Sequence, residues 1–272
     1  MDINEEKRKD NLLHLARVHE TAVVSPEAQL GKGVEVGPYS VIGDNVSIGD
    51  GTTIDSHVII DGMTEIGKDN EISVGVVIGY SPQHLDFDGE GTRVTIGDGN
   101  NIREYATIHR GTKEGKGETR IGNNNYIMAY CHIAHDCYLG DNIIMANSVN
   151  LAGHVEVEDR AFLAGLVGIH QFCRIGRMAM VGGHSKVVKD VPPYILVDGH
   201  PASVKGVNVV GLRRNGFSPD LRSKIKEAYR ILYRSKLRVS QAIEVMDQEL
   251  DSSREIEDFL RFLRNAQRGI CR

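Results

Sequence analysis

The stretch that decides the fold is residues 121–187, which reads in sixes as IGNNNY IMAYCH IAHDCY LGDNII MANSVN LAGHVE VEDRAF LAGLVG IHQFCR IGRMAM VGGHSK V. An aliphatic residue opens every hexad, from Ile121 to Val187, without a miss. A helix repeats its apolar residues every three or four positions and a simple strand every two, so neither explains a period of six. The period is typical of a parallel β-helix, in which three short strands and their turns form one coil of about 18 residues.

The same aliphatic ladder extends toward the N-terminus. It runs from Val18 to Ile78 and returns from Ile96 to Ile108. Because each layer of such a solenoid buries its neighbours, a ladder of this length predicts a mostly β chain with one continuous core. We therefore expect a hexapeptide-repeat β-helix over residues 18–191.

A second inward position follows four residues after each aliphatic residue, and it holds a small or β-branched side chain in most hexads. Cys131, Cys137 and Cys173 all fall on this position, so we interpret them as packing residues rather than redox groups. The chain has 4 cysteines in all, too few for a disulfide framework and without the paired spacing of a zinc site.

The ladder is interrupted twice. Residues 80–93 either depart from the pattern within their coil or bulge out as a loop. Residues 109–118 are rich in glycine and charge, and the ladder slips by one position across them. We predict that this second segment protrudes as a loop.

The two ends of the chain do not follow the repeat. Residues 1–17 form a charged leader with a short helix possible over 11–17, and the prolines that follow Val191 end the ladder. We expect a connecting segment over 192–218 and a small α-helical domain of about three helices over 219–272. Helix starts are indicated by an N-cap at Ser218-Pro219 and a capping box over 252–255.

Composition places limits on location and partners. No apolar run approaches the roughly 20 residues that cross a bilayer, and the N-terminal residues are charged, so we expect a cytoplasmic protein without stable membrane insertion. From residue 205 onward 15 Lys and Arg face 9 Asp and Glu, a net +6, whereas residues 1–204 hold 17 against 28, a net −11. The basic end suggests an acidic partner, although a solvated helical surface explains the charge equally well. We expect no nucleic-acid partner.

Four histidines, an aspartate and a glutamine lie within forty residues of the repeat. In neighbouring coils, residues 18 apart stack at about 4.8 Å, the spacing of parallel strands. His135 should therefore lie over Gly153, and Asp136 over His154; His132 should lie over Asn150, and His170 and Gln171 should join the same face. A base beside a carboxylate, one layer from an open glycine N–H, is suited to acyl transfer to a hydroxyl group.

Other interpretations of these histidines are open. His132, His135 and His154 are a candidate zinc set of the kind found in carbonic anhydrase-like hexapeptide proteins, although the Asp beside His135 and the helical tail fit that function less well. A solenoid scaffold without catalytic activity is the remaining alternative. His14, His19 and His57 are interpreted as surface residues.

Several motifs together resemble one family. They are IHRGT at 108–112, HIAHDC at 132–137, LAGHV at 151–155, HQFC at 170–173, DVPPY at 190–194 and GVN at 206–208. Over about residues 18–272 the chain resembles the acyl-carrier-protein-dependent UDP-N-acetylglucosamine O-acyltransferases of lipid A biosynthesis, a family of hexapeptide-repeat acyltransferases. The resemblance implies a left-handed helix, whereas the general rule for parallel crossovers favours the right hand.

The resemblance also implies an activity. It is the transfer of an (R)-3-hydroxyacyl group from the phosphopantetheine of acyl carrier protein to the 3-OH of UDP-N-acetylglucosamine, the first step of lipid A biosynthesis, without a metal or redox cofactor. N-acylation of a 3-amino analogue of that sugar is the alternative. A homotrimer with its site between subunits is implied as well, with the basic helical end meeting the acidic carrier protein.

Roles for individual residues follow from the same resemblance. His135 would be the general base, Asp136 its polarising partner and Gly153 the N–H donor to the tetrahedral intermediate. The implied substrate-binding residues are Gln83, His132, His154, His170, Gln171, Asn208 and Arg214, and Gly183 is implied at the floor of the acyl groove.

The chain departs from the family pattern at two places. Gln83 is followed by His84-Leu85-Asp86 where Asp-Leu-Lys is familiar, so the basic and acidic positions are exchanged next to a residue implied to contact the acceptor sugar. Arg214 is followed by Asn215 where a further Arg is common, which weakens a phosphate contact there.

Overall fold

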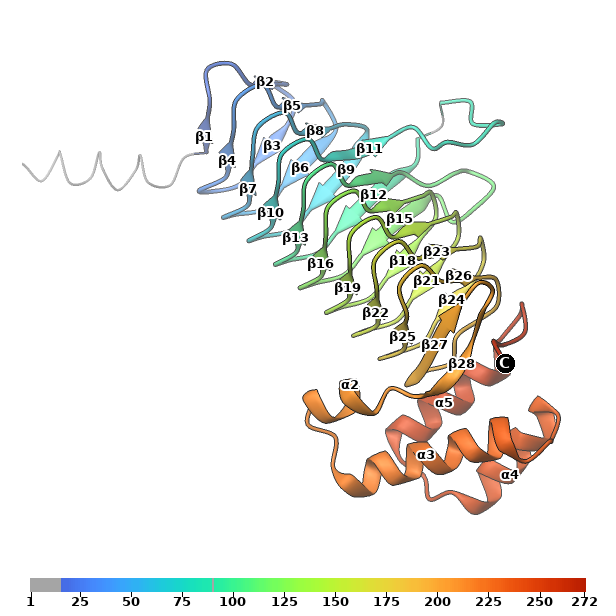
Figure 1. The fold of residues 1–272 in the computed structure, drawn as a ribbon. Helices are drawn as coiled ribbons and strands as arrows, with labels where there is room; N and C mark the ends of the chain where they lie inside the picture. Colours follow the sequence, from blue (N-terminus) through green and yellow to red (C-terminus); the bar gives the residue numbers. More distant parts are fainter. Residues whose placement is uncertain (1–15, 90) are drawn as a thin grey trace, which may run out of the picture.

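The fold is a long three-sided prism of stacked coils with a group of helices at one end (Figure 1). The computed structural model describes residues 16–89 and 91–272. Nearly all of the predicted leader, including most of its possible helix, lies outside the described residues. Among those described, no helix is long and apolar enough to cross a membrane.

The faces of the prism are three sheets, named A, B and C. Sheet A holds β1 (Arg17–Val18), β4 (Glu35–Val36), β7 (Thr53–Ile54), β10 (Glu71–Ile72), β13 (Asn101–Ile102), β16 (Tyr126–Ile127), β19 (Ile144–Met145), β22 (Phe162–Leu163), β25 (Met180–Val181), β27 (Ile195–Gly199) and β28 (Ala202–Val207). Sheet B holds β2 (Val23–Val24), β5 (Val41–Ile42), β8 (Ile59–Ile60), β11 (Val77–Tyr80), β14 (Thr107–His109), β17 (His132–Ile133), β20 (Asn150–Leu151), β23 (Gly168–Ile169) and β26 (Lys186–Val187). Sheet C holds β3 (Gln29–Leu30), β6 (Val46–Ile48), β9 (Met63–Ile66), β12 (Arg93–Ile96), β15 (Glu118–Ile121), β18 (Tyr138–Leu139), β21 (Glu156–Val157) and β24 (Arg174–Ile175).

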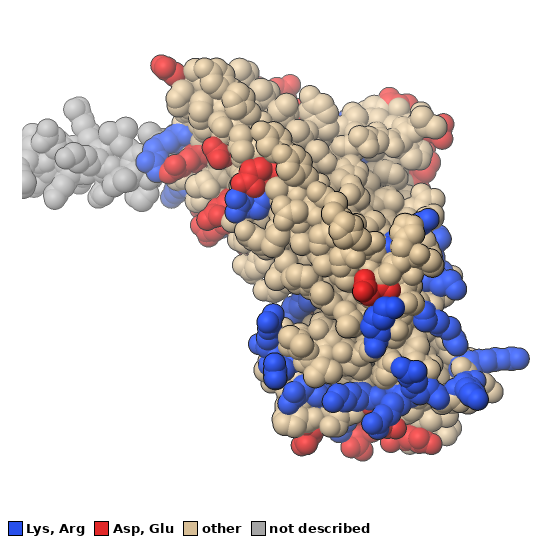
Figure 2. Space-filling view, in the orientation of Figure 1, with Lys and Arg blue, Asp and Glu red and all other residues tan. Residues whose placement is uncertain are grey.

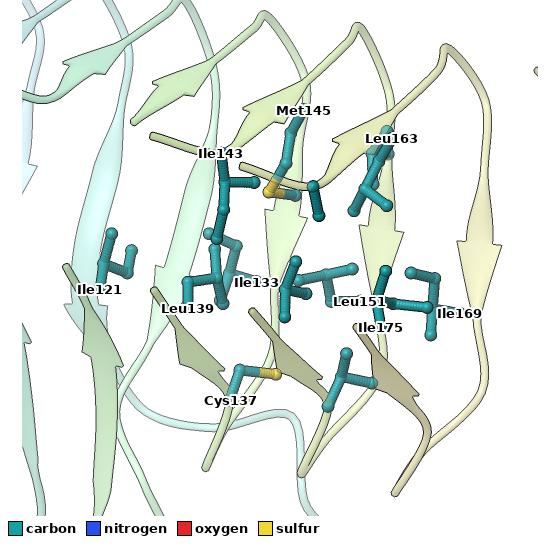
Figure 3. Close-up of a cluster of buried hydrophobic side chains, with 14 of the residues drawn as sticks. Ile121, Ile133, Cys137, Leu139, Ile143, Met145, Leu151, Leu163, Ile169 and Ile175 are labelled. Carbon is teal, nitrogen blue, oxygen red and sulfur yellow. The ribbon is translucent and has the colours of Figure 1, made fainter. Parts of the chain in front are cut away.

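The register between coils confirms the 18-residue period. Ile133 of β17 pairs in parallel with Leu151 of β20, and Leu151 pairs with Ile169 of β23. These side chains point into the prism and pack on one another in layers (Figure 3). The second inward position is buried as well, since Cys131, Cys137 and Cys173 are all buried. Burial raises the pKa of the Cys137 thiol to about 12, which agrees with a packing role.

The coils from residue 124 to 184 turn their corners on residues in the left-handed backbone region. Between residues 124 and 184 such a residue with positive φ recurs every sixth position, and it is never glycine; Tyr130, Asp136 and His154 are examples. A left-handed residue with a Cβ costs roughly 1–2 kcal/mol. The cost is offset because most of these corners are hydrogen-bonded to the corner of the coil before them, as where the His154 N–H donates to the His135 carbonyl at 3.0 Å.

Two loops leave the prism at the same corner, which we name the BC corner because it joins each sheet B strand to the next sheet C strand (Figure 1). The first loop, 81–92, lies between β11 and β12, and the coil that holds it pairs residues 30 apart, such as Met63 and Arg93. The second loop, 110–117, lies between β14 and β15, where Arg93 pairs with Glu118, 25 residues on. Both predicted interruptions are therefore insertions into otherwise regular coils.

The segment 192–218, predicted as a connection, instead extends sheet A. β27 pairs in parallel with β25, β28 returns antiparallel to β27, and the short helix α2 (Val209–Arg214) follows. The reason is the place of Pro192 and Pro193, which sit at a turn where the ladder needs no N–H donor, so the coil continues beyond them.

Three further helices close the end of the prism, as predicted. They are α3 (Pro219–Arg234), α4 (Val239–Glu249) and α5 (Arg254–Arg264). Ser218 caps α3 by accepting from the Leu221 N–H at 3.2 Å. The cap of α5 is Ser253, one residue later than the predicted box, and the Ser252 hydroxyl bonds the Glu257 carboxylate instead.

Candidate active site

The predicted constellation lies at the BC corner, on the three successive turns that follow β17, β20 and β23. The repeat places His135 and Gly153 one above the other, and Asp136 and His154 beside them on the next position of each turn. The stacking derived from 18-residue spacing is therefore confirmed, as is the pairing of His132 with Asn150.

The centre of the site is a histidine bonded to a buried carboxylate. The His135 Nδ1 atom lies 2.8 Å from Asp136 Oδ2. The Asp136 side chain is 0% exposed and the His135 side chain is 12% exposed, so of the two only the His135 imidazole is accessible to a substrate. A carboxylate held at Nδ1 fixes the proton on that nitrogen and leaves Nε2 as the acceptor.

The buried Asp136 carboxylate stays ionised because donors surround it. It accepts the Thr112 hydroxyl at 2.7 Å and the Lys116 N–H at 2.7 Å. Burial alone would raise the pKa of Asp136, but the hydrogen bonds from His135, Thr112 and the Lys116 backbone outweigh it and lower the pKa to about 2. The group beside His135 is therefore a full negative charge at neutral pH.

Gly153 lies directly under the His135 ring. A Cβ added at Gly153 would come within 2.5 Å of His135 Cε1, so only glycine leaves room for the imidazole. The Gly153 N–H has no hydrogen-bond acceptor among residues 16–89 and 91–272. A free donor next to the base is the arrangement that oxyanion stabilisation requires.

His154 closes the side of the site toward the next coil. Its ring stacks on Phe172 at 4.4 Å between centroids and meets the His135 ring edge-on at 5.1 Å. Its Nε2 atom lies 3.9 Å from Asp136 Oδ2. Burial lowers the pKa of His154, although the Asp136 charge acts in the opposite direction, so the ring is neutral at physiological pH.

His132 faces the preceding coil rather than the acid–base pair. Its Nδ1 atom lies 2.7 Å from the Thr107 hydroxyl, and its ring meets His109 edge-on at 5.0 Å. Burial, with the neighbouring His132 and His135, lowers the pKa of His109 to about 4. These rings extend the site along sheet B as neutral imidazoles.

The remaining residues assigned to this corner are exposed. His170 and Gln171 lie on the turn after β23, and the His170 Nδ1 atom lies 3.1 Å from the Gln171 carbonyl. Gln83 is exposed on the first loop. Of the histidines interpreted as surface residues, His19 and His57 are exposed, and His14 lies outside the described residues.

Two contacts of the site were not predicted from the sequence. His84, carried by the first loop, meets the His135 ring edge-on at 5.3 Å between centroids. Its Nδ1 atom is buried and has no partner among the described residues. The departure at His84 was the signal that could have found it, whereas the IHRGT motif at 108–112 contains Thr112 but gave no reason to place it against Asp136.

Gly183, Asn208 and Arg214 lie elsewhere on the chain. Gly183 is exposed on the turn from β25 to β26, at the AB corner, which joins sheet A to sheet B. Asn208 caps α2, accepting from the Gly211 N–H at 3.0 Å, and donates to the Met178 carbonyl at 2.9 Å. Asn208 and Arg214 line a groove of about 670 Å³ between α2 and sheet A. Within one chain these three residues do not meet His135.

The alternative zinc set, His132, His135 and His154, is not gathered as one group of ligands among the described residues. Among the described residues, the possible metal group is instead His135, Asp136 and His154, whose ligand atoms lie within 4.8 Å of one another. Asp136 Oδ2 already accepts from the Thr112 hydroxyl and lies against the His135 ring nitrogen. The geometry therefore favours acid–base chemistry over metal ligation at this corner.

A hexapeptide β-helix that carries a histidine–carboxylate pair beside an open glycine N–H defines the class of hexapeptide-repeat acyltransferases. Two family matches agree. Residues 27–62 and 118–153 match the family described as bacterial transferase hexapeptide (six repeats). Residues 190–271 match the second domain of UDP-N-acetylglucosamine O-acyltransferase.

Relatives over nearly the whole chain identify the family. The chain is 51% identical to the acyl-[acyl-carrier-protein]–UDP-N-acetylglucosamine O-acyltransferase of Halorhodospira halophila, over 95% of this chain and 100% of that protein. It is similar to the solved UDP-N-acetylglucosamine acyltransferase of Francisella novicida, with TM-score 0.92 and 43% identity over 94% of each chain. For the enzyme of Bacteroides fragilis the TM-score is 0.91 and the identity 43%, over 93% of this chain and 99% of that one. The chain belongs to the family of acyl-[acyl-carrier-protein]–UDP-N-acetylglucosamine O-acyltransferases.

The charge of Asp136 should make the free energy of unfolding depend on pH. The pKa of about 2 in the folded protein lies below the roughly 3.9 of an unfolded Asp. The stabilisation is therefore complete above about pH 4 and is lost as the pH falls toward 2. We expect the stability difference between wild type and Asp136→Asn, measured by urea unfolding, to be largest above pH 4 and to shrink below it. A difference that is constant from pH 6 to pH 3 would contradict this assignment.

Proposed function

We propose that this chain transfers an (R)-3-hydroxyacyl group from acyl carrier protein to the 3-OH of UDP-N-acetylglucosamine. The observation that carries the proposal is the His135–Asp136 pair at 2.8 Å, with the Gly153 N–H open directly under the ring. The names of the relatives support the donor and the acceptor. The reaction that we propose is the first step of lipid A biosynthesis, and we place it in the cytoplasm.

The chemistry follows from the two nitrogens of His135. Nδ1–H donates to the ionised Asp136, so Nε2 accepts the proton of the sugar hydroxyl as its oxygen attacks the thioester carbon. The Gly153 N–H stabilises the negative oxygen of the tetrahedral intermediate. When the intermediate collapses, the C–S bond breaks and the leaving thiolate takes the proton back from His135. The products are the sugar ester and free phosphopantetheine thiol.

This mechanism uses no metal and no redox cofactor. The acyl group arrives as a thioester, which is already activated, and transfer to oxygen changes no oxidation state. The base, its carboxylate and the oxyanion donor are all supplied by the turns after β17 and β20.

We also propose that the site is completed by a second copy of the chain, in a homotrimer. Gly183, Asn208 and Arg214 lie on other faces of the prism than His135, so they reach a common substrate only from a neighbouring chain. The AB corner carries a column of side chains that are each more than half exposed and suited to burial between copies: Tyr39, Tyr105, Tyr130 and Leu166. In this arrangement Gly183 borders the acyl groove, and its place at the floor of that groove stays a prediction.

The carrier protein would dock on the helical end. Figure 2 shows Lys and Arg side chains in a band across the helical domain, while the coils on this face carry few. α3 carries an exposed basic stripe, Lys226, Arg230 and Arg234, whose members are four residues apart and so lie on one side of the helix. Such a stripe complements an acidic partner and steers its approach.

Replacing His135 by Ala should lower kcat by at least about 100-fold and leave the assembly intact, because a general base contributes roughly 10²- to 10⁴-fold. The assay would use acyl carrier protein thioesters with UDP-N-acetylglucosamine and with its 3-amino analogue, before and after treatment with a chelator. His19→Ala, which removes an exposed histidine of the first coil, is the control.

A folded His135→Ala enzyme with near-normal kcat would remove this residue from the role of base. Activity lost with the chelator and restored by zinc would overturn the metal-free mechanism. A wild-type preference for the 3-amino sugar would replace O-acylation by N-acylation.

Reversing the basic stripe with Lys226→Glu, Arg230→Glu and Arg234→Glu should raise KM for the acyl carrier protein donor about 10-fold, because like charges then oppose docking. KM for a small acyl-pantetheine donor should not change. The control, Lys32→Glu with Lys68→Glu, adds negative charge on the N-terminal coils instead. An equal effect per reversed charge in both sets on the carrier protein donor would show that only net charge matters and refute docking on α3.

A further inference from the structure

The second loop, 110–117, is placed where it can act on the catalytic pair. It leaves the BC corner between β14 and β15, and these strands pair directly with β17 and β18, whose connecting turn carries His135 and Asp136. Across the coil that holds the loop, paired residues are 25 apart instead of 18, so this coil has seven extra residues at the corner next to the acid–base pair.

The extra residues fold back onto the Asp136 carboxylate. Thr112 gives it two donors, the hydroxyl at 2.7 Å from Oδ2 and the backbone N–H at 3.1 Å from the same oxygen. The Lys116 N–H donates to Oδ1 at 2.7 Å. Gly115 passes so close that a Cβ there would come within 2.5 Å of both carboxylate oxygens.

A second threonine holds the backbone of the same residue. The Asp136 N–H donates to the Thr119 hydroxyl at 2.8 Å, and the Thr119 side chain is buried inside the prism. The backbone of Asp136 is thus fixed from β15 and its side chain from the loop. Between these contacts the carboxylate meets the His135 ring, whose Nδ1 lies 2.8 Å from Oδ2, while His154 Nε2 lies farther away at 3.9 Å.

We propose that loop 110–117 is a clamp that orients the Asp136 carboxylate toward His135 Nδ1, with Thr112 as the positioning residue that acts through Asp136. The inference rests on the proposed function, because it concerns the base of that reaction. Thr112 touches neither substrate nor His135 in this account. Its hydroxyl and N–H prevent the carboxylate from rotating away, so that Nδ1 keeps the proton and Nε2 stays free to accept one.

The effect expected from losing the Thr112 hydroxyl is on turnover rather than on binding. Thr112→Val keeps the shape and the backbone donor but removes one hydrogen bond to a charged group, a type of bond strong enough to change a rate roughly 10- to 100-fold. We expect kcat to fall at least about 10-fold, while KM for both substrates stays within about twofold. Thr112→Ser, which retains the hydroxyl, should restore kcat to within about threefold of wild type.

Two further variants separate the clamp from a general effect on folding. Gly115→Ala should lower kcat in the same way, because its methyl group pushes the loop off the carboxylate. Glu114→Ala, an exposed change in the same loop, should have no effect on kcat. If Glu114→Ala lowered kcat as much as Thr112→Val, the loop would matter for its integrity and the clamp would be refuted.

The decisive comparison is a double-mutant cycle with Asp136→Asn. If Thr112 acts only through Asp136, adding Thr112→Val to Asp136→Asn should lower kcat by less than about twofold further. Full additivity of the two changes, or a Thr112→Val enzyme with wild-type kcat, would overturn the inference. The proposed function would still stand in either case, as long as the unmutated enzyme transfers the acyl group. Wild-type protein that transfers no acyl group to either sugar would instead overturn the proposed function.

Discussion

The constraint on which the structure depends is the stacking of each corner on the corner of the coil before it. Backbone hydrogen bonds such as that from the His154 N–H to the His135 carbonyl tie the corners together, and left-handed residues turn the chain at every sixth position from 124 to 184. Strand spacing then fixes neighbouring layers about 4.8 Å apart. A rigid column of this kind brings a histidine, a carboxylate and an open glycine N–H to the same corner of neighbouring coils.

The same stacking sets the electrostatics of the site. Asp136 occupies a corner position that is fully buried, where an unpaired charge would be very costly. The inserted loop satisfies it with Thr112 and Lys116, so the carboxylate remains charged, while His109, His132 and His154 remain neutral because burial lowers their pKa values. Among the imidazoles of the site, His135 lies closest to the Asp136 charge, with Nδ1 at 2.8 Å from Oδ2. This contact distinguishes His135 from the neutral histidines around it.

Most of this could be predicted from sequence because the period is strict. The 18-residue spacing predicted that Gly153 stacks on His135 and that His154 stacks on Asp136. The glycine and charged residues of 109–118 indicated a loop. Contacts made by insertions could not be predicted, since loops have no period; the positions of His84 and Thr112 are therefore findings of the structure. Roles implied by the resemblance do not say which corner of the prism a residue occupies. Gly183 is 48 residues from His135, which is not a multiple of 18, so the two residues lie at different corners. The strands beyond Pro193 were not predicted because the two prolines were interpreted as the end of the repeat, whereas in the structure they lie at a turn.

The most direct test of a site shared between chains is complementation in mixed assemblies. Chains carrying His135→Ala and chains carrying Arg214→Glu would be purified separately, and also co-expressed with different tags and purified through both. Each chain alone should be nearly inactive, whereas the mixed assemblies should recover a substantial fraction of wild-type turnover, because some sites then join an intact His135 to an intact Arg214. Mixed assemblies no more active than the separate chains, or an Arg214→Glu chain fully active by itself, would contradict a site built from two copies.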